Sequence, residues 1–204
     1  EGGIKVHNYK NATFVQCKFI NNLVKNSYRD YGLGGGLYIG MVDHLYIANC
    51  LFLNNSANQG GAIMLYWNSE RKFYTRNIVN TIFHGNRAKF EGGALKAKVS
   101  INIFAIHCYF IDNFATEGGG AELVVISTFI MFIKTTFINN SASTKGGALF
   151  ASYCSRVKIH NCSFRNNDAI ISGAALWLGI IQKQVFLEFT VFTNNTSTQD
   201  DGGA

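Results

Sequence analysis

The chain has 204 residues, of which 48% are hydrophobic and 15% are charged, and its formal net charge is +6 at pH 7. Its basic side chains are scattered, so it lacks the basic stripe with interleaved aromatic residues that a nucleic-acid surface needs, and we expect no nucleic-acid partner. The most apolar stretch, residues 123–133, is too short to span a bilayer as a helix. We therefore expect membrane contact only through regions outside these residues.

A four-residue motif, Phe-x-x-Asn, recurs along the chain. In chain order its copies read FINN, FLNN, FHGN, FIDN, FINN, FRNN and FTNN. The first two intervals between copies are 33 and 31 residues, and the later intervals are 27 or 28 residues. A fixed period of this size is typical of a solenoid, in which each repeat buries its apolar side against its neighbours. The copies begin at Phe19, Phe52, Phe83, Phe110, Phe137, Phe164 and Phe192.

The positions around each Phe predict a strand followed by two corners. Cys or Thr stands two residues before the Phe, which is the spacing of a strand with one buried face. An Asn stands three residues after every Phe, and Asn tolerates the left-handed conformation of turns and can bond their backbone. A glycine-rich step follows and marks a second corner, because glycine permits positive φ. We expect a buried ladder, one rung per coil, of Asn22, Asn55, Asn86, Asn113, Asn140, Asn167 and Asn195.

Two or three short strands in a turn of about 27 residues describe an all-β parallel β-helix of about seven coils. The composition agrees, because the chain has 21 glycines and no proline, and proline would remove a donor from a strand ladder. A leucine-rich-repeat-like horseshoe is the alternative, since IANCLFLNNSA from Ile47 and IHNCSFRNNDA from Ile159 fit its template. Against it, the residues after each glycine step are β-branched or aromatic and form helices poorly.

The pairing of Phe-x-x-Asn with Gly-Gly-Ala and an aliphatic residue resembles the repeats of chlamydial polymorphic outer-membrane proteins. GGAI at Gly60 and GGAL at Gly92 and Gly146 carry the resemblance, whereas GGAE at Gly119 and GAAL at Gly173 depart from it. The resemblance implies a right-handed β-helix at a cell surface or outside the cell, used in adhesion or coat assembly. Because the chain opens on EGG and closes on DGGA, we interpret residues 1–204 as one repeat array, a fragment of a longer protein.

The sequence offers no set of residues typical of catalysis. Polysaccharide-cleaving β-helices need two or three carboxylates on one face, and this chain has only twelve acidic residues. Asp112 and Asp168 lie two coils apart, and Asp200 and Asp201 close the chain. The five histidines fall at different positions of the repeat, which does not indicate a metal site. We expect no enzyme activity, no metal and no cofactor.

Cysteine and asparagine suggest covalent modifications. Cys17 and Cys50 fall at the same position of adjacent coils, within disulfide range at a stacking distance of about 4.8 Å, although buried free thiols are the simpler interpretation. Asn-x-Ser/Thr sequences, the acceptors of N-glycosylation, indicate a secreted glycoprotein. A sixth such site begins at Asn195, in the expected ladder, and should stay bare. The candidate glycosylation sites are Asn11, Asn54, Asn139, Asn161 and Asn194.

One set of outward positions is apolar, which a solitary solenoid would not need. Six residues before the Phe stand Tyr46, Phe104, Met131 and Phe186, and a contiguous apolar stripe of this kind marks a contact surface. We therefore predict a noncatalytic structural or adhesive segment that self-assembles into a filament or binds a protein partner. The alternative is a carbohydrate-binding or carbohydrate-cleaving β-helix with its active site elsewhere, in which Tyr66, Trp67 and Trp177 would stack on glycans.

Overall fold

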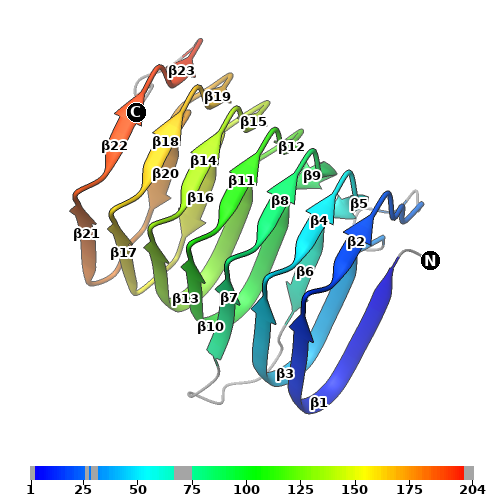
Figure 1. Cartoon of the computed structure of the whole chain (residues 1–204). Helices are drawn as coiled ribbons and strands as arrows, with labels where there is room; N and C mark the ends of the chain where they lie inside the picture. The colour runs from blue at the N-terminus through cyan, green and yellow to red at the C-terminus, as the bar shows by residue number, and fades with distance from the viewer. Residues whose placement is uncertain (1–2, 26–27, 29–31, 67–74, 200–204) are drawn as a thin grey trace.

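The computed structural model describes residues 3–25, 28, 32–66 and 75–199. These residues form strands and turns, and no helix occurs in these four ranges. Every strand pair is parallel, and the strands of successive coils lie side by side along the solenoid, with β1 and β23 at its opposite ends (Figure 1). The predicted parallel β-helix is thus confirmed, and the horseshoe is wrong because the described residues after the motif form strands of sheet C and no convex helical segment.

Three parallel sheets run along the solenoid. The largest, sheet A, contains β1 (Ile4–Val15), β3 (Leu37–Ala48), β6 (Ile63–Tyr66), β7 (Thr75–Val79), β10 (Leu95–Ile106), β13 (Glu122–Ile133), β16 (Leu149–Ser152), β17 (Arg156–His160), β20 (Leu176–Gly179) and β21 (Gln184–Glu188). Sheet B contains β2 (Lys18–Ile20), β4 (Leu51–Leu53), β8 (Ile82–His84), β11 (Tyr109–Ile111), β14 (Thr136–Ile138), β18 (Ser163–Arg165) and β22 (Val191–Thr193). Sheet C contains β5 (Ser56–Gln59), β9 (Arg87–Glu91), β12 (Phe114–Ala115), β15 (Ser141–Ala142), β19 (Asp168–Ala169) and β23 (Thr196–Ser197).

Each copy of the motif supplies one of the seven strands of sheet B. Its Phe pairs in register with the Phe of the next copy, as Phe83 does with Phe110. The five copies from Phe83 to Phe192 follow a period of 27 or 28 residues, and the two N-terminal coils are longer. The regular part of the solenoid therefore has about five turns, and the predicted seven coils include the two longer ones.

The chain turns at residues with positive φ, which recur at fixed positions of the repeat. The corner between sheets B and C uses only Asn, Asp and Gly, the residues that adopt the left-handed conformation at the lowest cost. Its residues, two after each Phe, are Asn21, Asn54, Gly85, Asp112, Asn139, Asn166 and Asn194. The corner between sheets A and B lies three before each Phe, at Gln16, Asn49, Asn80, His107, Lys134, Asn161 and Phe189.

The glycine step needs both of its glycines, for different reasons. The first glycine of each step has positive φ, as at Gly60 and Gly92. The second lies against the backbone of the next coil, because a Cβ added to Gly61 would collide with the carbonyl oxygen of Gly93. The same close approach occurs at Gly93, Gly120 and Gly147, and it explains why most copies of the motif read Gly-Gly, whereas Ala174 holds the second position in the copy at Gly173.

A fourth column of positive φ lies within sheet A, where the sequence gives no turn signal. It contains Asn8, Met41, Ile126, Tyr153 and Ile180, and it coincides with the gaps between β16 and β17 and between β20 and β21. β-Branched residues rarely adopt this conformation, so Ile126 and Ile180 are strained. Both side chains are exposed, at 51% and 60%.

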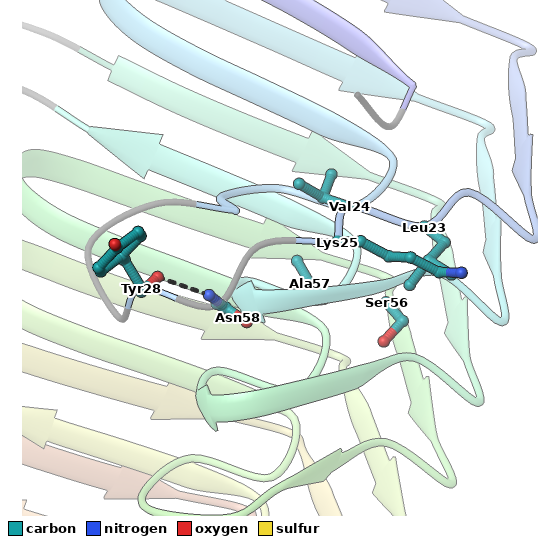
Figure 2. Close-up of a pocket in the computed structure, with 7 residues that line it drawn as sticks. All are labelled: Leu23, Val24, Lys25, Tyr28, Ser56, Ala57 and Asn58. Carbon is teal, nitrogen blue, oxygen red and sulfur yellow. Dashed lines mark hydrogen bonds between the residues drawn. The ribbon is translucent and has the colours of Figure 1, made fainter.

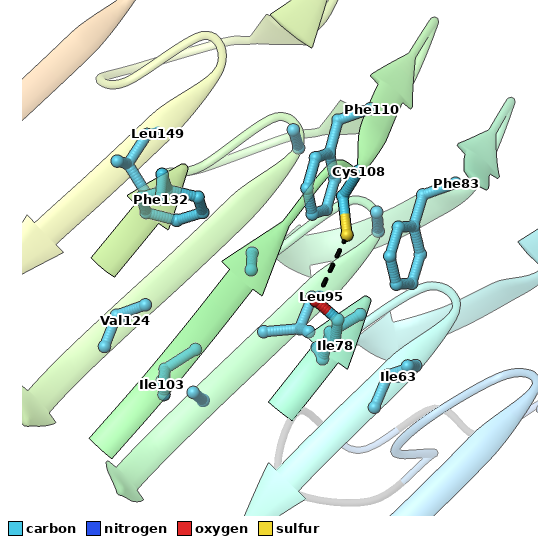
Figure 3. Close-up of a cluster of buried hydrophobic side chains, with 14 of the residues drawn as sticks. Ile63, Ile78, Phe83, Leu95, Ile103, Cys108, Phe110, Val124, Phe132 and Leu149 are labelled. Atoms are coloured by element: carbon cyan, nitrogen blue, oxygen red, sulfur yellow. Dashed lines mark hydrogen bonds between the residues drawn. The ribbon is translucent and has the colours of Figure 1, made fainter. Parts of the chain in front are cut away.

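The interior is filled by like side chains stacked from coil to coil. The motif phenylalanines stack face to face, with ring centroids 4.5–5.0 Å apart and interplanar angles of 1–11°. Figure 3 shows Phe83 and Phe110 in this stack, next to the buried Ile78 and Ile103 of sheet A. Since each ring packs against the ring of the next coil, the phenylalanines fix the register of the coils as well as excluding water.

The predicted asparagine positions form a continuous hydrogen-bonded ladder beside this stack. Asn113 illustrates the pattern: its backbone N–H and its Nδ2 both donate to Asn140 Oδ1, at 3.1 and 3.0 Å. Its Nδ2 also donates to the Phe83 carbonyl at 3.0 Å, and its Oδ1 accepts from Asn86 in the same way. The interior asparagines are fully buried, so the ladder satisfies backbone groups at a corner where the sheets leave them unpaired.

The Cys and Thr positions form a second ladder rather than disulfides. Each thiol or hydroxyl donates to the carbonyl two residues earlier, as Cys50 Sγ does to Ala48 at 3.2 Å and Thr81 Oγ1 to Val79 at 2.9 Å. The Cys17 backbone N–H donates to Cys50 Sγ at 3.4 Å. All five cysteines are free thiols in this structure, which is the simpler of the two interpretations, and Cys17 and Cys50 do not form the possible disulfide. Cys17 Sγ points at the Val15 carbonyl, and Cys50 Sγ points at the carbonyls of Ala48 and Phe14.

One carboxyl group is buried in the apolar core. Glu122 occupies the position held in neighbouring coils by Leu95 and Leu149, with which it pairs in β10 and β16. It is 1% exposed, and neither of its carboxyl oxygens has a hydrogen-bond partner. Burial raises the pKa of Glu122 to about 8, so the group is largely protonated at neutral pH.

Candidate interaction surface

The outward face of sheet A carries the predicted apolar stripe in one register column. Tyr46, Phe104, Met131 and Phe186 all lie in that column, as predicted from their spacing. The column is not continuous, however, because Asn77 separates Tyr46 from Phe104 and Lys158 separates Met131 from Phe186. The expectation of a contiguous stripe is therefore wrong, since polar residues occupy this column in the third and sixth coils.

The apolar character is concentrated where β10 and β13 lie next to each other. Phe104 and Met131 pair directly, Ile106 pairs with Ile133, and the ring of Phe129 meets that of Phe104 edge to face at 5.8 Å. All five side chains are partly exposed on the outward face. We call these five residues the apolar patch. Two neighbouring coils supply it, and no charged residue interrupts it.

The C-terminal side of the apolar patch is charged. Glu188 Oε2 lies 3.0 Å from His160 Nδ1 and 3.4 Å from Lys158 Nζ. The hydrogen bond with His160, and then Lys158, hold the pKa of Glu188 below its usual range. Arg156 pairs in register with Phe129 at the edge of the patch and is exposed. The patch thus has a polar, mostly basic rim, which is common around protein contact surfaces.

An open pocket lies on the N-terminal part of the solenoid, away from the apolar patch. Figure 2 shows its lining side chains, with Asn58 Nδ2 donating to the Tyr28 carbonyl at 2.7 Å. Lys25 is the charged residue among the described residues that line it. Among these described lining residues no carboxylate stands beside Lys25. The lining residues are Leu23, Val24, Lys25, Tyr28, Ser56, Ala57 and Asn58.

The carboxylates considered for catalysis remain dispersed. Asp112 forms a pair with His84 at 3.0 Å on the outside of sheet B, and Asp168 begins β19 in sheet C. Asp200 and Asp201 lie outside the described residues. Within the part of the chain that the structure describes, no three His, Cys, Asp or Glu side chains are grouped as metal ligands would be.

The aromatic residues considered for glycan stacking are only partly accessible. Trp177 stacks on Phe150 with ring centroids 4.4 Å apart, and Lys145 Nζ lies 5.0 Å from the Trp177 ring centroid. Tyr66 is partly buried, and Trp67 lies outside the described residues. The surroundings of Trp177 thus include both an aromatic ring and a cation.

Sequence reasoning missed a buried ion pair near the glycine corner. Lys96 is 5% exposed, contacts the carboxylate of Glu91 and donates to Gln59 Oε1 at 2.8 Å. It lies outside the core on sheet A, in the register column of Met64. A Lys on a strand that also contains Lys98, Ser100 and Asn102 resembles a solvated residue in sequence, so only the fold brings its partners to it.

The comparison with known protein families finds a repeat at positions where the sequence shows the Phe-x-x-Asn and Gly-Gly-Ala motifs. In the described part of the chain, no helix is long and apolar enough to cross a membrane. No solved structure matches the chain significantly. A curated relative, metabotropic glutamate receptor-like protein R of Dictyostelium discoideum, is 29% identical over 115 residues, which is 56% of this chain and 6% of the relative. The chain thus spans a small part of that relative. A family model, the Chlamydia polymorphic membrane protein repeat, matches residues 49–65 and 134–152, so the chain carries this repeat at two places.

Proposed function

We propose that this chain is a noncatalytic structural or adhesive segment of a surface repeat protein, and that it associates through the apolar patch. The repeat it carries is that of a membrane protein family, and the Dictyostelium relative is named as receptor-like. Both resemblances support a location at the cell surface or outside the cell. The proposed occupant of the patch is a second copy of the chain.

The observation that carries this proposal is the apolar patch on an outward sheet face. Outward positions of sheet A tolerate polar residues, because Asn77 and Lys158 share the register column of Phe104 and Met131. Arg156 shares the column of Phe129, and His160 shares that of Ile106 and Ile133, so the fold does not require the five apolar side chains. Grouped apolar side chains that the fold does not require mark a contact surface.

The column itself provides the variants that test the proposal. Phe104→Asn and Met131→Lys introduce the residue types that neighbouring coils already carry at this position. We expect the double variant to fold as the wild type does and to lose association. The matched control is Tyr109→Ser, which removes an exposed aromatic residue from β11 of sheet B, outside the apolar patch.

Light scattering on a sizing column over a range of concentrations measures the association. The proposal predicts that the mass of the wild type and of Tyr109→Ser rises with concentration, and that the double variant stays monomeric. A wild-type monomer at every concentration would contradict self-association, and unchanged association of the double variant would contradict the patch as its site.

Carbohydrate binding is the second candidate function, favoured by the Trp177–Phe150 stack and the adjacent Lys145. An indole ring beside a cation suits an acidic sugar. Titration of the chain with acidic oligosaccharides, compared with Trp177→Leu, tests it. Saturable binding that the variant loses would support this function, and equal binding by both proteins would exclude Trp177.

A further inference from the structure

We propose that N-linked oligosaccharides occupy Asn54, Asn139 and Asn194, in a row along one corner of the solenoid. Each of these residues begins an Asn-x-Ser/Thr sequence. All three lie at the corner between sheets B and C, with φ of 52°, 53° and 51°. The shared conformation points their side chains away from the core, and all three are exposed.

The amide groups at this corner are accessible for modification. Among the described residues, neither Asn54 nor Asn139 nor Asn194 has a hydrogen-bond partner for its side chain, whereas the adjacent ladder asparagines are fully bonded. The corner separates short strands, so a bulky group there meets solvent and no neighbouring sheet. At a rise of about 4.8 Å per coil, the three sites are about 14 Å and 10 Å apart along the axis.

The modification is a group transfer from a lipid-linked oligosaccharide pyrophosphate. The asparagine Nδ2 forms a bond to the anomeric carbon of the first sugar, and the bond from that carbon to the pyrophosphate oxygen breaks. Nδ2 loses one proton, and the lipid pyrophosphate leaves with the electron pair of the broken bond. No group is oxidised or reduced.

Asn195 provides an internal contrast, because it also begins an Asn-x-Ser/Thr sequence. Its Nδ2 donates to the Phe164 carbonyl at 3.0 Å, and its Oδ1 accepts from Asn167 Nδ2 at 2.9 Å. A glycan on this nitrogen would remove the last rung of the ladder. The fold therefore assigns Asn194 as the modified residue of two adjacent acceptors.

The row of glycans would leave the apolar patch open. Sheet B separates the corner that carries the three asparagines from the face of sheet A that carries the patch. No Asn-x-Ser/Thr sequence begins in β10 or β13, which supply the patch. The proposal rests on one part of the proposed function, the location outside the cell. It does not depend on association through the apolar patch.

The test is a map of occupied sites on the full chain secreted from a eukaryotic cell line. Enzymatic removal of glycans converts each occupied asparagine to aspartate, which peptide mass spectrometry locates. We expect conversion at Asn54, Asn139 and Asn194 and none at Asn195 in the secreted, folded protein. Unmodified Asn54 and Asn139, or conversion at Asn195, would overturn the proposal.

Two neighbouring substitutions separate the adjacent acceptors. Thr196→Ala removes only the acceptor sequence of Asn194, and Ser197→Ala removes only that of Asn195. The intact mass should fall by one glycan in Thr196→Ala and stay unchanged, apart from the substitution, in Ser197→Ala. The reverse pattern would assign the glycan to Asn195. Light scattering on the same samples reports association independently, so failure of either proposal is distinguishable.

Discussion

Replacing the buried Glu122 by Leu should stabilise the protein at neutral pH and remove a pH dependence. Its neighbours in the register column, Leu95 and Leu149, show that a leucine side chain fits the site. In the folded protein the carboxyl group has no hydrogen-bond partner, and burial raises its pKa from 4.5 to about 8. In the unfolded chain the same group ionises near pH 4.5.

The sign and size of the effect follow from these two pKa values. Between pH 4.5 and 8 the folded state binds one more proton than the unfolded state, so the free energy of unfolding falls as pH rises. Each pH unit costs about 1.4 kcal/mol, so the loss reaches about 3 kcal/mol at pH 7 and about 5 kcal/mol at pH 8. Below pH 4.5 both states are protonated and this cost vanishes.

Urea unfolding followed by circular dichroism at pH 5, 6, 7 and 8 measures the effect. The wild type should lose stability steadily across this range relative to Glu122→Leu, and the gap should widen with pH. Glu122→Gln separates titration from packing, because it should remove the pH dependence yet keep a buried polar group without a partner. Glu117→Gln, which removes a less buried carboxylate of the same coil, should keep the wild-type slope. Parallel pH profiles for wild type and Glu122→Gln would refute the reasoning.

Three further predictions concern the corners and the core. Asn113→Ala should lower the free energy of unfolding by about 3 kcal/mol, measured by urea titration, because it leaves buried partners in the ladder without hydrogen bonds. The control Asn166→Gly, at the exposed corner, should change the free energy of unfolding little. Ile126→Asn should raise the melting temperature by relieving about 1 kcal/mol of left-handed strain, and a fall would show that Ile126 contributes packing that outweighs the strain. Phe110→Ala should lower the free energy of unfolding by about 4 kcal/mol, because it breaks the phenylalanine stack. If it lowers the free energy of unfolding no more than Tyr109→Ala on the outer face does, the stack does not have this role.

The repeat made the architecture predictable because one physical requirement recurs at each position. Asn113 and its equivalents bond the next coil, and the phenylalanines stack, so the residue types survive in every copy. Spacing left the state of Cys17 and Cys50 open, because it indicates that the two sulfurs are near each other but not where they point. The column at Ile126 could not be predicted, since its residues are not turn formers and the tertiary structure imposes the conformation.

Departures from the repeat gather in the coil that contains β13, and this argues that the coil does more than extend the solenoid. On its inward side β13 places Glu122 where other coils have an aliphatic residue, and at its bend it holds Ile126, strained as Ile180 is in a later coil. Its outward side supplies Phe129, Met131 and Ile133 to the apolar patch. The first two features lower stability, and neither is required by the fold, because Leu149 and Tyr153 occupy the equivalent positions in the next coil. A strand that buries an unpaired carboxyl group and supplies an exposed apolar patch can gain from a partner that covers it, since binding then stabilises the folded coil.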